Sequence, residues 1–385
     1  MRRRKAASTV SKLDTENRQQ GINIIGFINA EMGIGESSRL AARAIETTDI
    51  PFGLINYPLK IATSMNDMSW AHKTIEAPLY NTNVYHLNAD FMTPALEHFG
   101  HSLFSNRYNI GYWHWELPDF PDEYVPAFKL VQEVWVCSNF VSESVARKST
   151  VPVVTIPHGI QVQFDPEMNR SSFALPENQF LFLMMYDLQS STMRKNPEAV
   201  IQAFKLAFDS NDTRVGLVLK VNNLNSRPDD LLAIRQLISQ QSNIHLIDKG
   251  LSRIEVNSLL NCTDCFVSLH RAEGFGLGLA EAMYLGKPVI GTNWSGNTDF
   301  MNDANSCPVS YKLVQVGQDW GPYKGYQTWA DPSVSHAADY MRRVVNDPEW
   351  RNEIAANGKT TIHNDYSPEA VGQKIKARLT ELSLV

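Results

Sequence analysis

Residues 268–297 read SLHRAEGFGLGLAEAMYLGKPVIGTNWSGN, and this stretch decides the fold of the chain. It begins at the end of an apolar run typical of a buried strand, and a glycine-rich turn follows at residues 274–278. The spacing then predicts a helix that ends near Gly286 and a second strand over residues 288–291. In an open α/β sheet, ligands bind at the carboxyl ends of strands, against helix N-termini, where glycines let them approach the backbone.

Two carboxylates flank this turn, Glu273 directly before it and Glu281 eight positions later in the predicted helix. Taken alone, the pair would be explained by a helix cap and a solvated helix residue. Together with the glycines and the run AEAMYLGKP, the pattern E-x7-E resembles the signature of the retaining family-4 glycosyltransferases. These enzymes have the GT-B fold, an α/β architecture of two Rossmann-like domains whose parallel sheets face each other across a cleft.

The resemblance implies roles for the residues of this stretch. Glu273 is expected to contact the hydroxyls of the transferred sugar, and Glu281 to hold the ribose of a nucleoside-diphosphate sugar. The backbone between them is expected to meet the diphosphate at Gly274, Phe275, Gly276 and Leu277.

The composition sets the class of protein. A chain of 385 residues with 43% hydrophobic and 20% charged residues suits two globular domains. Its net charge of −6 argues against a nucleic-acid partner. Cys262 and Cys265 form a lone C-x2-C without a second pair at zinc spacing, so packed thiols in a reducing compartment are expected. No apolar run reaches membrane-spanning length, which favours a cytoplasmic protein; the basic residues 2–5 could touch the inner membrane face.

The chain divides into an arm and two domains. Residues 1–20 are polar and predict a flexible arm, and residues 21–165 predict a Rossmann-like acceptor domain. Residues 166–365 predict a second Rossmann-like domain for the donor, in which 316–331 form an irregular loop. The resemblance implies that a last helix within 366–385 returns to the first domain.

The first domain carries a glycine loop and two candidate histidines. A buried strand over residues 22–29 leads to Gly33 and Gly35 and then a helix, an arrangement that binds anions. The third glycine of a dinucleotide fingerprint is missing, and the resemblance implies that this loop faces the donor phosphates and the acceptor. The family places a histidine beside the reacting sugar at a strand end. His114 and His86 both end predicted strands, and either fits.

The second domain carries the basic residues that the resemblance requires. Its first strand, residues 180–186, is followed by a loop with Arg194 and Lys195, whose charges can stabilise a departing diphosphate. Asp187 stands where the family usually has an arginine. The loop that begins at Asp248 is expected to lie under the nucleotide base.

The resemblance therefore implies a retaining, metal-independent hexosyltransferase that moves a sugar from a UDP- or GDP-sugar to a glycan or lipid-linked acceptor, and bacterial surface polysaccharide assembly is the expected setting. It needs no cofactor, and no D-x-D metal motif stands out, since Pro228, Asp229 and Asp230 predict a helix start. The alternatives are a GT-B phosphorylase or epimerase, or a binding protein on a decayed transferase fold.

Overall fold

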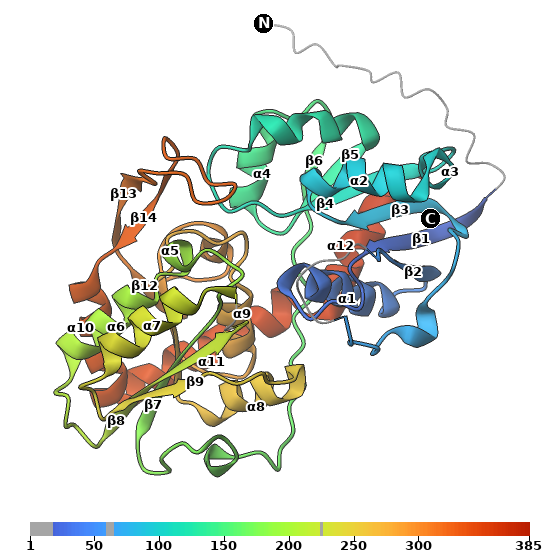
Figure 1. Ribbon diagram of the computed structural model, residues 1–385. Coiled ribbons are helices and arrows are strands. Elements are labelled where there is room, and N and C mark those ends of the chain that lie inside the picture. The colour runs from blue at the N-terminus through green and yellow to red at the C-terminus, as the bar shows by residue number, and fades with distance from the viewer. Residues whose placement is uncertain (1–17, 59–64, 224–225) are drawn as a thin grey trace, which may run out of the picture.

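The computed structural model describes residues 18–58, 65–223 and 226–385, and it shows two α/β domains side by side (Figure 1). Most of the predicted N-terminal arm, including the basic residues 2–5, lies outside the described residues. The first strand already begins at Gln19, so it includes the last two residues of the predicted arm.

The N-terminal domain is built on a parallel sheet of six strands in the order β2-β1-β3-β4-β5-β6. All of its strands except the partly exposed edge strand β6 are mostly buried because helices cover the sheet, which explains why the sequence shows continuous apolar runs. The strands are β1 (Gln19–Gly26), β2 (Phe52–Asn56), β3 (Tyr80–His86), β4 (Tyr108–Trp113), β5 (Glu133–Val136) and β6 (Val153–Thr155). The helices are α1 (Gly33–Glu46), η1 (Ala71–Lys73), α2 (Ala89–Phe99), α3 (His101–Phe104), η2 (Asp122–Leu130) and α4 (Asn139–Ala146).

The C-terminal domain repeats this plan with a parallel sheet in the order β12-β11-β10-β7-β8-β9. The strands are β7 (Phe180–Asp187), β8 (Val215–Asn222), β9 (Ile244–Ile247), β10 (Cys265–Ser268), β11 (Val289–Thr292) and β12 (Cys307–Val309). The helices are η3 (Arg170–Phe173), α5 (Thr192–Lys195), α6 (Pro197–Ala207), α7 (Pro228–Ile238), α8 (Arg253–Cys262), α9 (Leu277–Tyr284), η5 (Gly296–Asp299), α10 (Val334–Asn346) and α11 (Pro348–Asp365). Two parallel sheets in one chain agree with the predicted fold class.

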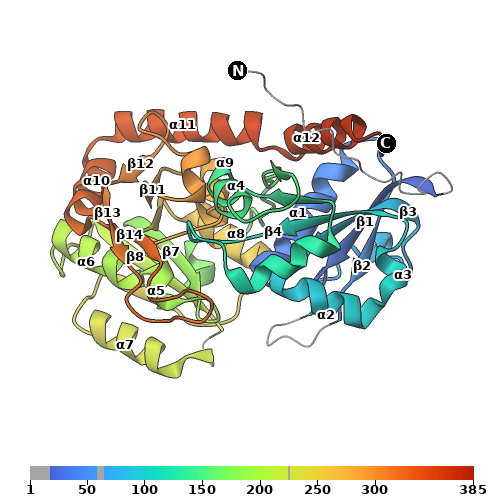
Figure 2. The same cartoon turned by 90° about the horizontal axis from the view of Figure 1, so that it is seen from above.

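The last helix, α12 (Pro368–Glu381), runs from α11 across to the N-terminal domain (Figure 2). A Cβ on Gly372 would lie 2.3 Å from the carbonyl oxygen of Ala44, so only glycine allows α12 to approach α1 this closely. Arg378 pairs with the fully buried Glu133 of β5, its Nε lying 3.0 Å from Oε1. The chain therefore returns to its first sheet after completing the second.

One predicted loop contains regular structure. Within residues 316–331, β14 (Thr328–Pro332) begins at Thr328 and pairs with β13 (Tyr311–Gln315) as an antiparallel hairpin. The connection between the two strands is longer than a hairpin turn and rich in glycine, which hides the pairing in the sequence. None of the helices in the described part of the chain is long and apolar enough to cross a membrane.

Candidate active site

The candidate residues of the C-terminal domain meet where its strand order reverses. β7 is followed in the chain by β8 and β9 on one side, whereas β10 lies on its other side and leads to β11 and β12. Arg194 and Lys195 follow β7, and Glu273 follows β10. Because β7 and β10 are neighbours, the loops after them come together at the topological switch point, where open α/β sheets bind ligands.

Glu273 and the two basic residues form one cluster. The Nζ of Lys195 lies 2.5 Å from Oε1 of Glu273, and the Nη1 of Arg194 lies 3.2 Å from the same oxygen. Burial would raise the pKa of Glu273, but the charges of Lys195 and Arg194 outweigh it and lower the pKa to about 2. The carboxylate is therefore ionised at neutral pH, so it can accept hydrogen bonds from sugar hydroxyls but cannot act as a general acid.

The second glycine turn of the quoted stretch holds the backbone of Glu273 in place. The N–H of Glu273 donates to Oγ of Ser295 at 2.8 Å, and the N–H of Gly296 donates to the carbonyl of Glu273 at 2.9 Å. Ser295 has a φ of 75°, in the left-handed region, and a Cβ on Gly296 would lie 2.0 Å from the carbonyl oxygen of Gly274. The turn is thus specified by both residues, and it fixes the direction of the Glu273 side chain.

Arg194 is more deeply buried than a solvent-facing phosphate ligand, with 5% of its surface exposed. Its Nη1 donates to the carbonyl of Ala272 at 2.8 Å, and its Nη2 donates to Ser190 Oγ at 2.8 Å and lies 3.7 Å from Glu116. The Oη of Tyr323 donates to Glu116 at 3.0 Å, so a residue of the loop before β14 closes this cluster. The geometry makes Arg194 a residue that positions Glu273, and it leaves Lys195, with a quarter of its side chain exposed, as the more accessible cation.

Glu281 lies in a second ionic cluster that joins the two domains. Arg253, at the start of α8, pairs with Glu281 and lies 3.9 Å from Oε1 of Glu36 on α1. Burial raises the pKa of Glu281, Arg253 lowers it and Glu36 raises it, with a net increase. Burial would raise the pKa of Glu36 as well, but Arg253, Arg39 and Arg43 lower it to about 2.

The glycine loop of the N-terminal domain borders this second cluster, because Gly35 directly precedes Glu36. A Cβ on Gly35 would lie 2.3 Å from the carbonyl oxygen of Ala30, so the turn requires glycine there. Gly33 is exposed, and a Cβ on it would meet no heavy atom of the described residues within 4 Å. Gly33 therefore leaves space at the start of α1.

The structure separates the two candidate histidines. His86 is 1% exposed, stacks on Tyr112 with ring centroids 4.3 Å apart, and contacts Oγ of Ser37 through Nδ1, which places it in the core. His114 is partly exposed, and burial of its ring lowers its pKa to about 4. Its neighbour His158 packs edge-on against Phe275 of the glycine-rich turn, with centroids 4.9 Å apart.

The turn after Glu273 is held against the N-terminal domain. The carbonyl of Gly274 accepts hydrogen bonds from Ser138 Oγ at 2.6 Å and Cys137 Sγ at 3.4 Å. Gly276 has a φ of 94° and caps α9 without a side chain, so the first N–H groups of that helix face no side-chain cap. An anion at this point would meet the positive end of the helix dipole.

Asp248 and Asp187 are engaged elsewhere. Asp248 pairs with Arg235 of α7, and Asp187 accepts from the side chain of Asn223 at 2.7 Å and from the backbone of its own loop. Burial lowers the pKa of Lys220, and the charges of the two aspartates raise it, with a net decrease to about 8. In the described part of the chain the partner of Asp248 is Arg235, and its expected place under the base stays a prediction.

Several residues of these clusters were not recognised in the sequence as site residues: Glu36, Glu116, Cys137, His158, Arg253 and Tyr323. Glu116 lies in the loop after β4 and Cys137 directly follows β5, positions that are typical of site residues in parallel sheets and could have indicated them. Arg253 and Tyr323 carry no local signal, since only the closed fold brings them to the site.

Comparison with known proteins shows what the chain is similar to. A family model described as "Glycosyl transferases group 1" matches residues 165–361, which is 197 of the 385 residues. The curated alpha-1,3/1,6-mannosyltransferase ALG2 of Dictyostelium discoideum is 27% identical over 124 residues, 32% of this chain but only 24% of that protein. The match thus spans about a quarter of that relative's length.

Solved structures resemble almost the whole chain. HepE of Anabaena, solved in complex with UDP-glucose, has a TM-score of 0.70 at 15% identity, covering 94% of this chain and 100% of that one. Sucrose-phosphate synthase from Thermosynechococcus elongatus has a TM-score of 0.67 at 13% identity, with 95% and 99% covered. These similarities confirm the GT-B fold that the sequence predicted.

Proposed function

Because the chain belongs to the glycosyl transferases group 1 family, we propose that it moves a hexose from a UDP- or GDP-sugar to a hydroxyl of a glycan or lipid-linked acceptor, with retention of the anomeric configuration. The observation that carries the proposal is the cluster of Glu273, Lys195 and Arg194 at the switch point of the C-terminal sheet. It joins a carboxylate suited to sugar hydroxyls with a cation suited to a diphosphate.

Donor binding would rearrange this cluster in a defined way. The diphosphate takes the ammonium of Lys195 and the N-terminus of α9. Glu273, released from Lys195 but still paired with Arg194, then accepts hydrogen bonds from the sugar. The ribose takes Glu281, and Arg253 moves from Glu281 toward Glu36, which already lies 3.9 Å away. Glu36 thereby keeps Arg253 paired while the donor is bound.

The groups left for proton transfer support the proposed retention. With the donor bound, Glu273 still pairs with Arg194, and Glu116 accepts a hydrogen bond from Tyr323, so neither carboxylate would be a strong base or nucleophile. The departing phosphate itself would take the acceptor's proton, on the face of the sugar that it leaves. His114, neutral at pH 7 because its pKa is about 4, would accept a hydrogen bond from the sugar or the acceptor.

The biological setting remains part of the proposal. HepE, which shares the fold, was solved with UDP-glucose, and ALG2 is a mannosyltransferase, so a hexose donor fits both relatives. We propose assembly of bacterial surface polysaccharide in the cytoplasm, with peripheral contact at the inner membrane face through residues 2–5. The intact cluster of Glu273, Lys195 and Arg194 favours this enzyme over the alternative of a binding protein on a decayed transferase fold.

A thermal-shift panel of nucleoside diphosphates and their sugars tests the function. A ligand at 100 times its dissociation constant stabilises the protein by about 2.7 kcal/mol, which is enough to rank bases. A panel in which every nucleotide, free or sugar-linked, leaves the melting temperature unchanged would contradict the proposed donor class.

We expect Lys195→Ala to weaken binding of the best nucleoside diphosphate by about 10- to 100-fold, because a charge-assisted contact contributes about 1.5–3 kcal/mol. Turnover falls as well, because charge on the diphosphate grows as the glycosidic bond breaks. Calorimetric titration measures the affinity. Lys205→Ala is the matched control. Lys205 lies at the far end of α6, where its Nζ donates to the carbonyl of Leu237 on α7, so this variant should change neither affinity nor turnover. Unchanged affinity in the Lys195 variant would leave that residue without a contact to the diphosphate.

We also expect turnover to persist in excess EDTA, because Lys195 and the N-terminus of α9 can balance the diphosphate charge that a metal balances in other transferases. The measurement is the initial rate with and without chelator, followed by addition of Mg²⁺ or Mn²⁺. Loss of turnover in EDTA that Mn²⁺ restores would remove Lys195 from its role at the leaving group.

A further inference from the structure

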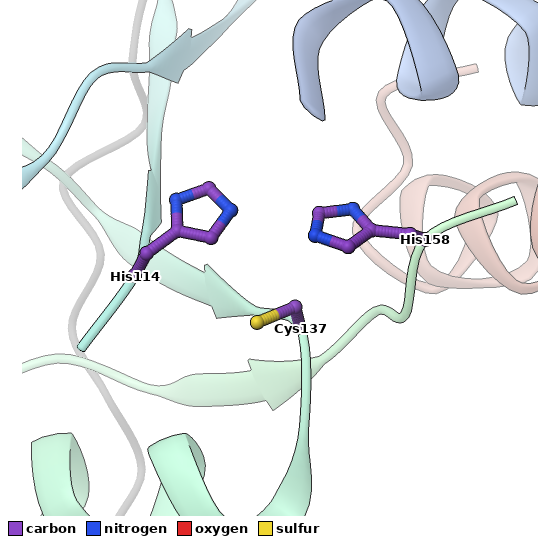
Figure 3. A group of neighbouring side chains, drawn as sticks. All are labelled: His114, Cys137 and His158. Carbon is purple, nitrogen blue, oxygen red and sulfur yellow. The ribbon is translucent and has the colours of Figure 1, made fainter. Parts of the chain in front are cut away.

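Three possible metal ligands lie together on the N-terminal side of the site. Each of His114, Cys137 and His158 offers one ligand atom, and these atoms all lie within 4.8 Å of one another. The rings of the two histidines lie side by side with their edges toward each other, and the sulfur of Cys137 lies below them in the view (Figure 3). Trp113 of β4 and Val136 of β5 lie opposite each other in the sheet, and His114 and Cys137 are the residues that directly follow them. His158 lies in the loop after the adjacent strand β6.

Hydrogen bonds fix the tautomer of both histidines. Oδ1 of Asn88 accepts from the backbone N–H of His114 at 3.0 Å and therefore also accepts from Nδ1–H of the same residue at 3.3 Å. The hydroxyl of Tyr112 donates its only hydrogen to the carbonyl of Ile156 at 2.6 Å, so it accepts from Nδ1–H of His158 at 3.4 Å. Both Nε2 atoms consequently carry free lone pairs, the arrangement that metal-ligating histidines adopt.

Cys137 can lose its thiol proton without leaving a buried carbonyl unsatisfied. Its Sγ donates to the carbonyl of Gly274, but that carbonyl also accepts from Oγ of Ser138 at 2.6 Å. A metal that binds the sulfur would release this proton to solvent, and the turn at Gly274 would keep its other hydrogen bond.

We propose that His114, Cys137 and His158 bind one Zn²⁺ ion through two imidazole nitrogens and one thiolate. Zinc takes tetrahedral sets of nitrogen and sulfur ligands, whose donor atoms are about 3.3–3.6 Å apart at its usual bond lengths. From a spacing of at most 4.8 Å, the side chains need to close by only about 1 Å. Hard cations such as Mg²⁺ prefer oxygen ligands, so the site selects against them.

Bound zinc would inhibit transfer, a consequence that rests on the proposed function. The ion occupies Nε2 of His114, which the proposed reaction leaves open for the sugar or acceptor. It also sits against the turn at Gly274 and Phe275, through Cys137 and His158. A fourth coordination position is left for water.

Metal titration of the whole protein tests the site. Co²⁺ takes tetrahedral zinc sites and gives a near-ultraviolet thiolate-to-cobalt charge-transfer band, and Zn²⁺ competition then reports affinity and stoichiometry. We expect one equivalent bound by the wild type and a loss of at least about 100-fold in affinity in both Cys137→Ser and His158→Asn. The matched control is Cys262→Ser, because Cys262 carries the half-buried thiol at the end of α8, and this thiol donates to the carbonyl of Met168.

The outcomes separate the site from the function. Equal binding by wild type and both ligand variants, or a cobalt adduct without the charge-transfer band, would overturn the site. Turnover inhibited by one equivalent of Zn²⁺, unaffected by Mg²⁺ and restored by EDTA, would support the inhibitory consequence. Zinc that binds without changing the rate would overturn that consequence alone. The metal-binding assay needs no substrate, so it would still test the zinc site if the proposed function were wrong.

Discussion

Glu273→Gln lowers turnover at least 100-fold while affinity for the nucleoside diphosphate changes by less than about threefold: this is the result we expect. Such a loss corresponds to about 2.7 kcal/mol of transition-state stabilisation. Glutamine keeps the size of the side chain, but it replaces an ionised acceptor held by Lys195 and Arg194 with a neutral amide. Steady-state kinetics and calorimetry on the same preparation measure the two quantities.

The control for this variant is Glu281→Gln, which should show the opposite pattern. Glu281 is expected at the ribose, so its variant should weaken nucleotide binding more than it slows the bound donor. Near-normal turnover in Glu273→Gln would remove Glu273 from the sugar site, whereas loss of nucleotide affinity would show that it acts on the diphosphate.

The pH dependence of stability provides a second measurement on Glu273→Gln. The pKa of Glu273 is lowered from 4.5 to about 2 in the folded protein, so its ionised form stabilises the fold. This contribution is complete above about pH 4.5 and is lost as the pH falls toward 2. The difference in unfolding free energy between wild type and variant should therefore be constant near neutral pH and shrink in acid. A difference that grows in acid would contradict the ion pairing.

The sequence predicted those parts of the site that depend on local patterns. The strand, glycine turn and helix around Glu273 follow from periodicity and spacing within one stretch, whereas Lys195 was expected from the family resemblance, in the loop after an apolar strand. Their convergence follows from a general rule, because parallel strands end at the same edge of the sheet. The rule gives no side-chain depth, and for this reason the burial of Arg194 was not foreseen.

The contacts between domains could not be predicted in this way. Arg253 and Glu36 lie more than 200 positions apart, and neither has a neighbour in sequence that indicates the other. The grouping of His114 with Cys137 and His158 requires the strand order β4-β5-β6 and its register, which only the folded sheet supplies. Tyr323, which donates to Glu116, lies in the connection between β13 and β14, and the glycines of this connection hid the hairpin in the sequence.

Arg194→Met should lower the free energy of unfolding by about 3 kcal/mol or more, because it removes a buried cation from Glu273 and leaves the carbonyl of Ala272 and the hydroxyl of Ser190 without this donor. Methionine keeps most of the volume, so the loss reports the charge and the hydrogen bonds to Ala272 and Ser190. For domains of this size, about 3 kcal/mol corresponds to a decrease of roughly 6–12 °C in the thermal midpoint.

Lys195→Met is the matched comparison for Arg194→Met, because both side chains pair with the same oxygen of Glu273. The side chain of Lys195 is 24% exposed against 6% for Arg194, so water can replace much of what the lysine contributes. We therefore expect its midpoint to fall by no more than about 3 °C, in line with the ~1 kcal/mol limit of exposed pairs. Equal decreases in the thermal midpoint of the two variants would contradict the assignment of a positioning role to Arg194 and a leaving-group role to Lys195. Arg194 would then share the leaving-group role of Lys195, and the buried contacts to Ala272 and Glu116 would have to open when the donor binds.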